Sequence, residues 1–258
     1  MKTVILCGGF GTRIRGVADD IPKPMIPIGR FPILWHIMKT YSEFGIKEFI
    51  LCLGYKSEVV KDFFLNYRAM VSDCTISLDG SQAPVFHNTV SEADWKVTLA
   101  ETGLNAMTGS RVRQIQKYVG EETFMLTYGD GVGNIDIAAL IAFHKSHGRI
   151  ATVTGVQPPG RFGELVLDGS KVLSFNEKPQ ITGGYINGGF FVLDSRIFDY
   201  LDDREDLVLE KEPLRRLVAD QQLMVFKHDG FWQPMDTYRE YSMLNEMFMN
   251  GSAPWVRW

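Results

Sequence analysis

The stretch LCGGFGTRIRGVADDIPKPM, residues 6–25, follows a short apolar strand with a glycine-rich turn and two cations. Glycine lets a backbone come close to a ligand and adopt positive φ, so that several N–H groups can point at one anion. Arg13 and Lys23 flank the turn, and a proline on each side of Lys23 stiffens the backbone there. The stretch therefore predicts a site for an anionic ligand, with phosphate as the commonest choice. An ordinary strand-to-helix turn is the alternative.

Two common phosphate-binding loops do not fit this turn. A dinucleotide fingerprint needs glycine at its first, third and sixth positions, but the run that starts at Gly9 has Ile14 at the sixth. A Walker A loop needs lysine after its second glycine, and here Val17 follows Gly16. Neither a Rossmann dinucleotide loop nor a P-loop is therefore expected.

The segments around the turn alternate between buried strands and amphipathic helices. Residues 3–9 and 47–54 are apolar runs typical of buried strands, while 32–45 and 57–67 carry apolar residues at helical spacing. This alternation indicates a parallel sheet covered on both faces. Further strands are expected at 123–131, 149–157, 171–179, 185–194 and 222–230, and further helices at 135–147 and 236–251.

Residues 68–118 break this rhythm, and we expect an inserted β-rich segment there. The fold class is therefore α/β: one domain, residues 1–258, with a single Rossmann-like mixed, mostly parallel sheet, helices on both faces, and a C-terminal helix and tail at 236–258. In open α/β sheets ligands bind outside the carboxyl ends of the strands. The glycine turn and YGDG, residues 128–131, both follow predicted strands and should face the same crevice.

Composition narrows the function classes. The 258 residues carry a net charge of −4 without a lysine or arginine block, which disfavours a nucleic-acid or anionic-membrane partner. No signal peptide or membrane span is visible. Cys7, Cys52 and Cys74 are odd in number and lack metal-type spacing. Cys7 and Cys52 sit inside apolar runs and are expected to be buried thiols, which indicates a reducing cytoplasm.

Two aspartates are candidate ligands for a divalent cation. Asp130 stands between two glycines at a strand end, and Asp236 opens the last predicted helix. Mg²⁺ usually takes one or two protein carboxylates and completes its octahedron with water and substrate phosphates. A turn residue at 130 and a helix cap at 236 are the alternatives.

A second group of residues indicates recognition of hydroxyl groups. Asn187-Gly188-Gly189 interrupts an apolar strand, where glycine commonly marks a bulge or the close approach of a ligand. The Asn187 amide would offer a donor and an acceptor, as sugar binding requires. Glu177 and Lys178 form a charged pair before a proline, for which a solvated turn is the alternative.

Other chemistries find less support. His144 and His147 lie three residues apart without a nearby third ligand, so they are expected to be surface histidines and not a zinc site. The chain has no G-x-S-x-G elbow and no paired Cys/His signature, which disfavours covalent hydrolase chemistry.

The motifs GGFGTR, PKPM, YGDG, EKP, INGGFF and a late MD occur in the order typical of the sugar-1-phosphate nucleotidyltransferases. The chain resembles this family over essentially its whole length. Blocks such as WKVTLAETG, MTGSR, PPGRFGEL and FWQPMDT are similar to its glucose-1-phosphate cytidylyltransferase branch. The loop at 14–21, IRGVADDI, departs from the acidic, threonine-bearing stretch of close relatives, so affinity or base preference can differ.

The resemblance implies Mg²⁺-dependent transfer of CMP from CTP to glucose 1-phosphate, giving CDP-glucose and pyrophosphate for cell-surface polysaccharides such as O-antigen. It implies three catalytic cations: Arg13, Lys23 and Lys178. It implies contacts to the nucleotide from Leu6, Cys7, Gly8, Gly9, Phe10, Gly11, Thr12, Arg13, Lys23, Thr102, Gly103, Arg111 and Gly129. It implies contacts to the sugar phosphate from Gly163, Glu177, Lys178 and Asn187, and Mg²⁺ binding by Asp130 and Asp236.

Alternative functions stay open on the sequence. The same chemistry with another base or sugar, as in a thymidylyltransferase, is the nearest. A non-catalytic sugar-nucleotide-binding protein is an alternative of another class, disfavoured by the presence of both aspartates and all three site cations.

The tail APWVRW, residues 253–258, bears on assembly. Termini are normally polar and frayed unless they dock, and tryptophan is enriched at interfaces. Together with the resemblance, the tail and the insertion predict a homo-oligomer, with a hexamer as one such assembly. Folding of both tryptophans back onto their own domain is the alternative.

Overall fold

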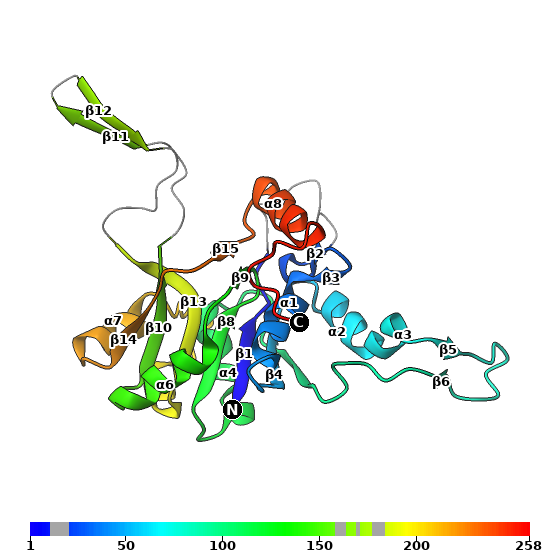
Figure 1. Ribbon diagram of the computed structural model, residues 1–258. Helices are drawn as coiled ribbons and strands as arrows, with labels where there is room; N and C mark the ends of the chain where they lie inside the picture. Colours follow the sequence, from blue (N-terminus) through cyan, green and yellow to red (C-terminus); the bar gives the residue numbers. More distant parts are fainter. Residues whose placement is uncertain (11–20, 158–163, 169–170, 177–183) are drawn as a thin grey trace.

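The computed structural model describes residues 1–10, 21–157, 164–168, 171–176 and 184–258. Its centre is a seven-stranded sheet in the order β14-β10-β13-β8-β1-β4-β7 (Figure 1). The bounds of these strands are β1 Lys2–Leu6, β4 Glu48–Leu53, β7 Lys96–Glu101, β8 Phe124–Tyr128, β10 Ala151–Val156, β13 Ile186–Leu193 and β14 Leu223–His228. Strand β13 is antiparallel to both neighbours and all other adjacent pairs are parallel, which confirms the predicted mixed, mostly parallel sheet.

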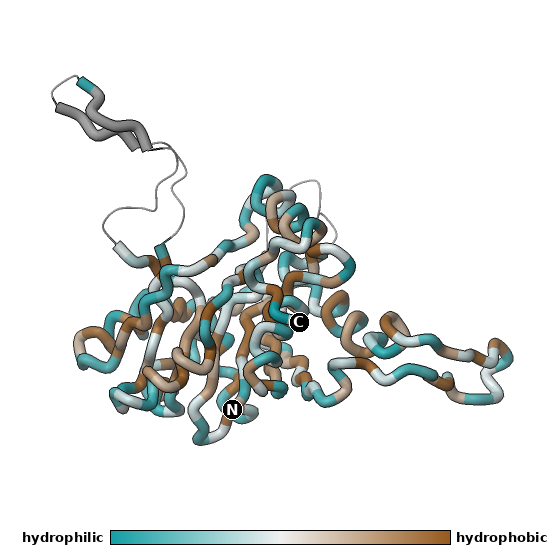
Figure 2. Tube along the Cα trace, in the orientation of Figure 1, coloured by the Kyte–Doolittle hydropathy of each residue, from teal (hydrophilic) through white to brown (hydrophobic). Residues whose placement is uncertain are grey.

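Side chains of the central strands alternate between two apolar cores. In β1, Ile5 packs into one core and Val4 into the other, and β4 divides in the same way. This alternation follows from the two-residue period of a strand and explains why these strands are apolar throughout. Figure 2 shows the hydrophobic residues concentrated on the sheet and the adjoining helices.

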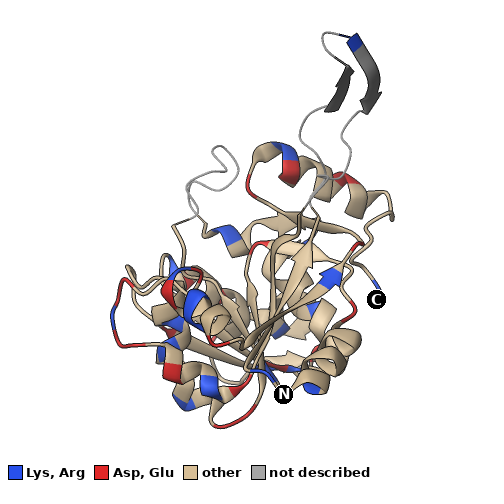
Figure 3. Cartoon of the chain, turned by 90° about the vertical axis from the view of Figure 1, so that its left-hand side faces the viewer, with Lys and Arg blue, Asp and Glu red and all other residues tan. Residues whose placement is uncertain are grey.

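Helices cover both faces of the sheet, as expected. One core takes residues from α1 (Ile33–Ser42), α2 (Ser57–Leu65), α6 (Ile137–His147) and α8 (Tyr238–Met249). The other takes residues from α4 (Thr108–Gln114), α5 (Gln116–Val119), the 3₁₀ helix η2 (Ser195–Tyr200) and α7 (Glu212–Ala219). Figure 3 shows lysines and arginines interspersed with acidic residues over these elements, in keeping with a chain that lacks a basic block.

The predicted insertion at 68–118 differs from the structure in its second half. Strand β7 belongs to the central sheet, where it pairs in parallel with β4, and α4 and α5 follow it. Its weakly alternating sequence reflects its place at the sheet edge, where several side chains are only half-buried. The extended part comprises α3 (Tyr67–Val71) and the short pair β5 (Cys74–Thr75) and β6 (Val85–Phe86), which leaves the body as an arm (Figure 1).

Smaller elements complete the chain. Three further short pairs are β2 (Pro27–Ile28) with β3 (Phe31–Pro32), β9 (Gly131–Gly133) with β15 (Trp232–Pro234), and β11 (Glu164–Asp168) with β12 (Lys171–Asn176). The 3₁₀ helix η1 covers Lys23–Met25. These short pairs matter because β9 and β15 join two distant parts of the chain at the candidate site.

The tail folds back onto its own domain. Trp255 is fully buried, and its ring stacks on Phe231 with centroids 5.7 Å apart. Its indole Nε1 donates to Nδ1 of the buried His36 at 3.4 Å, and Trp258 packs edge-on against Trp35. The two tryptophans are thereby explained within one chain, so they no longer argue for a subunit contact.

Candidate functional site

The pair β9–β15 brings Asp130 and Asp236 together. Asp130 lies two residues after the end of β8, and β15 runs antiparallel to β9 with Pro234 opposite Gly131. The backbone N–H of Met235 donates to the Asp130 carbonyl at 2.8 Å. Two aspartates that lie 106 positions apart in the sequence thus reach one point beyond the carboxyl ends of the parallel strands.

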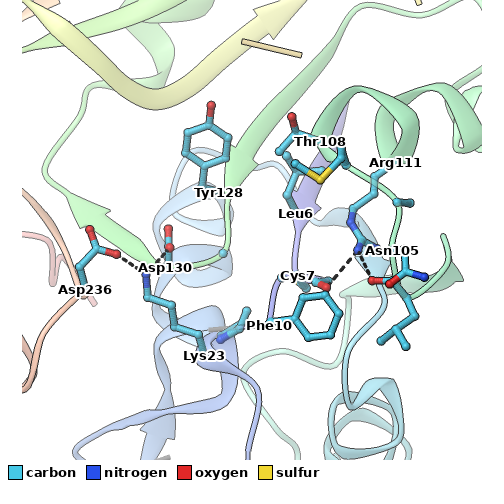
Figure 4. A pocket seen from close by; sticks show the side chains of 17 residues that line it. Leu6, Cys7, Phe10, Lys23, Asn105, Thr108, Arg111, Tyr128, Asp130 and Asp236 are labelled. Atoms are coloured by element: carbon cyan, nitrogen blue, oxygen red, sulfur yellow. Dashed lines mark hydrogen bonds and ion pairs between the residues drawn. The ribbon is translucent and has the colours of Figure 1, made fainter. Parts of the chain in front are cut away.

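Lys23 lies between these two carboxylates (Figure 4). Its Nζ is 2.5 Å from an oxygen of Asp130 and 2.5 Å from an oxygen of Asp236. Burial lowers the pKa of Lys23, but the charge of Asp130 and the hydrogen bonds to both carboxylates outweigh it, so its pKa is raised. The flanking prolines and η1 fix the backbone that delivers this cation, as the sequence predicted.

The side chain of Asp236 does not cap helix α8. That role belongs to Thr237, whose hydroxyl accepts from the N–H of Glu240 in a capping box. The Glu240 carboxylate in turn accepts from the Asp236 N–H at 2.7 Å. The Asp236 carboxylate therefore faces Lys23 and Asp130, which removes the capping alternative.

The glycine turn after β1 is packed against a buried arginine. The carbonyl of Gly8 accepts from Nη2 of Arg111 at 3.0 Å. A Cβ on Gly8 would lie 2.1 Å from that guanidinium, and one on Gly54 would lie 2.6 Å from it. A side chain at either position would have to displace the arginine from its hydrogen bonds.

Arg111 joins three loops at the carboxyl ends of the strands. Besides Gly8, its guanidinium donates to the carbonyls of Leu53, Gly103 and Leu104 and to the Thr102 hydroxyl. Burial lowers the pKa of Arg111 from its usual value, and its rigid fork satisfies these acceptors without a carboxylate. Its positive charge faces the cavity uncompensated by any of these neutral partners.

Thr102 and Gly103 support Arg111 and do not line the cavity. The Thr102 hydroxyl is buried between the Leu53 carbonyl, 2.7 Å away, and the arginine. Gly103, at φ +92°, turns its carbonyl towards Arg111. The predicted role of both residues at the nucleotide base is therefore at most indirect in this arrangement.

A cavity of about 500 Å³ opens between Arg111 and the cluster formed by Lys23, Asp130 and Asp236. Its lining combines predicted site residues with others to which the sequence analysis assigned no contact with a ligand. The predicted ones are Leu6, Cys7, Gly8, Gly9, Phe10, Lys23, Arg111, Gly129, Asp130 and Asp236. The others are Pro24, Leu104, Asn105, Ala106, Met107, Thr108 and Tyr128. The residues at 104–108 follow β7, so recognition of β7 as a central strand would have placed them here.

A second cavity of about 230 Å³ adjoins the first. Both are lined by Tyr128, Asp130 and Asp236, and the second adds Asn187, Gly188 and Trp232. The Trp232 indole donates to the Gly188 carbonyl at 2.7 Å, which holds the glycine stretch of β13 close to β15. Two compartments with a shared acidic wall suit two substrates that react at their boundary.

Six predicted site residues lie outside the described residues: Gly11, Thr12, Arg13, Gly163, Glu177 and Lys178. His144 and His147 both hydrogen-bond the Thr152 hydroxyl, at 2.9 and 2.8 Å, which accounts for them without a metal. His144 is buried, so the expectation that both would be surface histidines was wrong for it.

Across the described part of the chain, no group of three or more His, Cys, Asp or Glu could hold a metal ion. Within the same part, no helix has the length and apolar character to cross a bilayer.

Comparisons with known proteins agree with the motif order. A glucose-1-phosphate cytidylyltransferase of Salmonella typhi is 49% identical over the full length of both chains. A probable glucose-1-phosphate cytidylyltransferase of Bacillus subtilis is 46% identical, also over both full lengths.

A solved structure shares the fold at lower identity. HddC from Yersinia pseudotuberculosis, complexed with GMP-PN, has a TM-score of 0.68 at 24% identity and covers 96% of this chain and 99% of its own. The sequence profile described as nucleotidyl transferase matches residues 2–247. These matches confirm the resemblance: the chain belongs to the nucleotidyl transferase family.

Proposed function

We propose that the protein transfers a cytidylyl group from CTP to glucose 1-phosphate, giving CDP-glucose and pyrophosphate. The observation that carries this proposal is the convergence of Asp130, Asp236 and Lys23 at the boundary of two adjoining cavities. Relatives of the same length and 46 to 49% identity carry the name of this activity. The choice of cytosine and glucose rests on those relatives.

The reaction joins two polyanions, so the site has to neutralise charge. A phosphate oxygen of glucose 1-phosphate attacks the α-phosphorus of CTP in line, and pyrophosphate leaves. Because the nucleophile is already an anion, the reaction requires no general base. Catalysis then consists of positioning and electrostatic stabilisation, which Lys23 and Arg111 support from opposite sides of the larger cavity.

The donor set fits Mg²⁺. Asp130 and Asp236 direct two hard oxygen ligands at one cationic atom, Nζ of Lys23. Two protein carboxylates with room for phosphate oxygens are what this ion usually takes. When bound, it would withdraw charge from the phosphates. Lys23 would then turn to the triphosphate, with Arg13 and Lys178 as the other proposed cations.

The remaining proposals concern setting and assembly. We place the protein in the cytoplasm, as a supplier of sugar nucleotides for cell-surface polysaccharides. We also propose a homo-oligomer, with a hexamer as one such assembly. With the tail docked internally, support for it comes from the arm, where Ile76, Leu78 and Val85 expose 55, 98 and 52% of their surfaces.

A panel of CTP, dTTP, UTP and GTP, each with glucose 1-phosphate and Mg²⁺, tests the function through pyrophosphate release. We expect CTP to be preferred by at least about tenfold in kcat/KM, equivalent to about 1.4 kcal/mol. A preference for dTTP or GTP would contradict the cytidylyl assignment. Binding of CDP-glucose without turnover of any nucleotide would indicate a non-catalytic binding protein.

A further inference from the structure

Glu210, in the loop before α7, touches both cavities through other side chains. Its Oε1 accepts from the Tyr128 hydroxyl at 2.5 Å, and its Oε2 accepts from the Thr108 hydroxyl at 2.6 Å. Thr108 lines the larger cavity, and Tyr128 lines both. No sequence motif singled out Glu210.

The direction of each hydrogen bond follows from the carboxylate. A carboxylate only accepts, so Tyr128 and Thr108 must each spend their single hydroxyl hydrogen on Glu210. Tyr128 can then only accept from the Asn187 amide, whose Nδ2 lies 3.0 Å from its hydroxyl.

These hydrogen bonds fix the orientation of the Asn187 amide. Its Nδ2 faces Tyr128 and its Oδ1 accepts from the Gly189 N–H at 2.8 Å. Both partners demand the same orientation, since one can only accept and the other can only donate. One amide hydrogen and one lone pair remain for sugar hydroxyls in the smaller cavity.

On the other side of Glu210, hydrogen bonds of Thr108 and Gly109 fix the wall of the larger cavity. The Thr108 oxygen accepts from the Leu209 N–H at 2.9 Å, while the Gly109 N–H donates to the Leu207 carbonyl at 2.9 Å. A Cβ on Gly109 would lie 2.8 Å from the Leu207 side chain. The segment that carries Glu210 is therefore attached firmly to the start of α4.

We propose that Glu210 is a positioning residue that orients the sugar-reading amide of Asn187 through Tyr128 and ties it to the nucleotide cavity through Thr108. This inference rests on the proposed function, because it assigns sugar phosphate to the smaller cavity and nucleotide to the larger. A carboxylate beside two sites for anions is otherwise unfavourable, and its use as a double acceptor explains its presence.

Steady-state kinetics on four variants test the proposal. Tyr128→Phe should raise the KM for glucose 1-phosphate about tenfold and Thr108→Val the KM for CTP about threefold, with kcat within about threefold of wild type. Glu210→Ala should raise both KM values. Glu212→Gln, two residues away and paired with Arg204 on the surface, is the matched control and should match wild type.

The split between the two KM values separates positioning from general destabilisation. The double variant Tyr128→Phe/Glu210→Ala should have a KM for glucose 1-phosphate no higher than that of the more impaired single variant. Both substitutions interrupt the same chain of hydrogen bonds, so their effects should not add. KM values within twofold of wild type in Glu210→Ala and Tyr128→Phe would overturn the inference. A uniform loss of kcat in all three site variants would also overturn it. If Glu210→Ala does not fold, Tyr128→Phe decides, since it removes one oxygen only.

The same experiment keeps the two proposals apart. Wild type is assayed first, and its failure to turn over any sugar phosphate would contradict the proposed function. Calorimetric titration of glucose 1-phosphate into wild type and Tyr128→Phe would then test the inference alone. Equal affinity for the two proteins would overturn it.

Discussion

At the scale of single residues, the site depends on charges held in fixed places by the backbone around them. Lys23 meets Asp130 and Asp236 at 2.5 Å each because prolines fix its own segment and the β9–β15 pair fixes theirs. An ammonium between two carboxylates balances a site that would otherwise repel itself. In the Asp130–Lys23–Asp236 cluster, Lys23 therefore offsets part of the negative charge of the two aspartates.

Replacing either aspartate by asparagine should abolish activity while the protein stays folded. Loss of one carboxylate removes several kcal/mol of transition-state stabilisation, and a fall of about 10³-fold or more in kcat is expected. Pyrophosphate release measures this, with circular dichroism as the check on folding. Asp199→Asn, at an exposed position in η2, is the control. Near-normal turnover in Asp236→Asn would exclude the metal role.

Arg111 gives a prediction about stability. Arg111→Lys keeps the charge but cannot reach the acceptors on three loops, so the free energy of unfolding should fall by about 2 kcal/mol. Urea denaturation measures it. Arg113→Lys, on the same helix, alters an exposed pair with Asp203 and a local hydrogen bond to Gln116, and it should change stability by less than about 0.5 kcal/mol. Equal effects from the two variants would contradict the role given to Arg111.

At the scale of elements, the sequence was informative where hydrophobic periodicity was strong. The pattern at 32–45 became α1, the runs at 47–54 and 185–194 became β4 and β13, and the YGDG turn lies where β8 ends. Strand β7 was missed because, at the edge of the sheet, it is half-buried and its sequence resembles a surface hairpin.

The site was predictable to a similar degree. Charged residues beside glycines and prolines, such as Lys23 and Asp130, stand out in a sequence. The contacts of Arg111 do not, because its acceptors are backbone carbonyls that any sequence provides. Glu210 was invisible for a related reason: its partners come from α4 and β8, which only the fold brings together.

His36, which contacts the docked C-terminal tail, should make the protein less stable in mild acid. Burial lowers the pKa of His36 to about 4, and the neutral ring donates to Ile28 and accepts from Trp255. An unfolded histidine has a pKa of about 6.5, so below that pH the unfolded chain binds a proton that the folded protein does not. The contribution of His36 to the free energy of unfolding is fully present above pH 6.5, and it falls by up to about 3 kcal/mol as the pH is lowered towards 4.

Urea unfolding of wild type and His36→Gln between pH 7 and 4 measures this dependence. The slope of stability against pH should be smaller in the variant. Some slope should remain, because burial also lowers the pKa of His144 to about 4. An unchanged slope would mean that His36 does not take part.

At the scale of the whole molecule, the central sheet brings the site residues together, and the arm exposes an apolar surface. The carboxyl ends of β1, β7 and β8 carry the larger cavity, as expected for an open α/β sheet. The arm extends away from the central sheet (Figure 1), and its Ile76, Leu78 and Val85 side chains are exposed. This surface is the feature that the proposed oligomer accounts for.

Leu78→Glu should weaken that assembly. A charge on a side chain that is 98% exposed has little effect within one chain, but it opposes burial against a partner. Light scattering across a dilution series should show a smaller species than wild type at equal concentration. Gln82→Glu, exposed on the same arm, adds a charge without removing an apolar contact and serves as the control. A wild-type monomer with full activity at micromolar concentration would refute the assembly.

The central claim is that the phosphate of the sugar attacks the α-phosphorus of CTP. The most direct measurement uses glucose 1-phosphate with ¹⁸O in its three non-bridging phosphoryl oxygens, together with unlabelled CTP and Mg²⁺, and analyses the products by mass spectrometry. We expect CDP-glucose that retains all three labels and pyrophosphate that carries none. Label in the pyrophosphate, or formation of CMP without CDP-glucose, would contradict it.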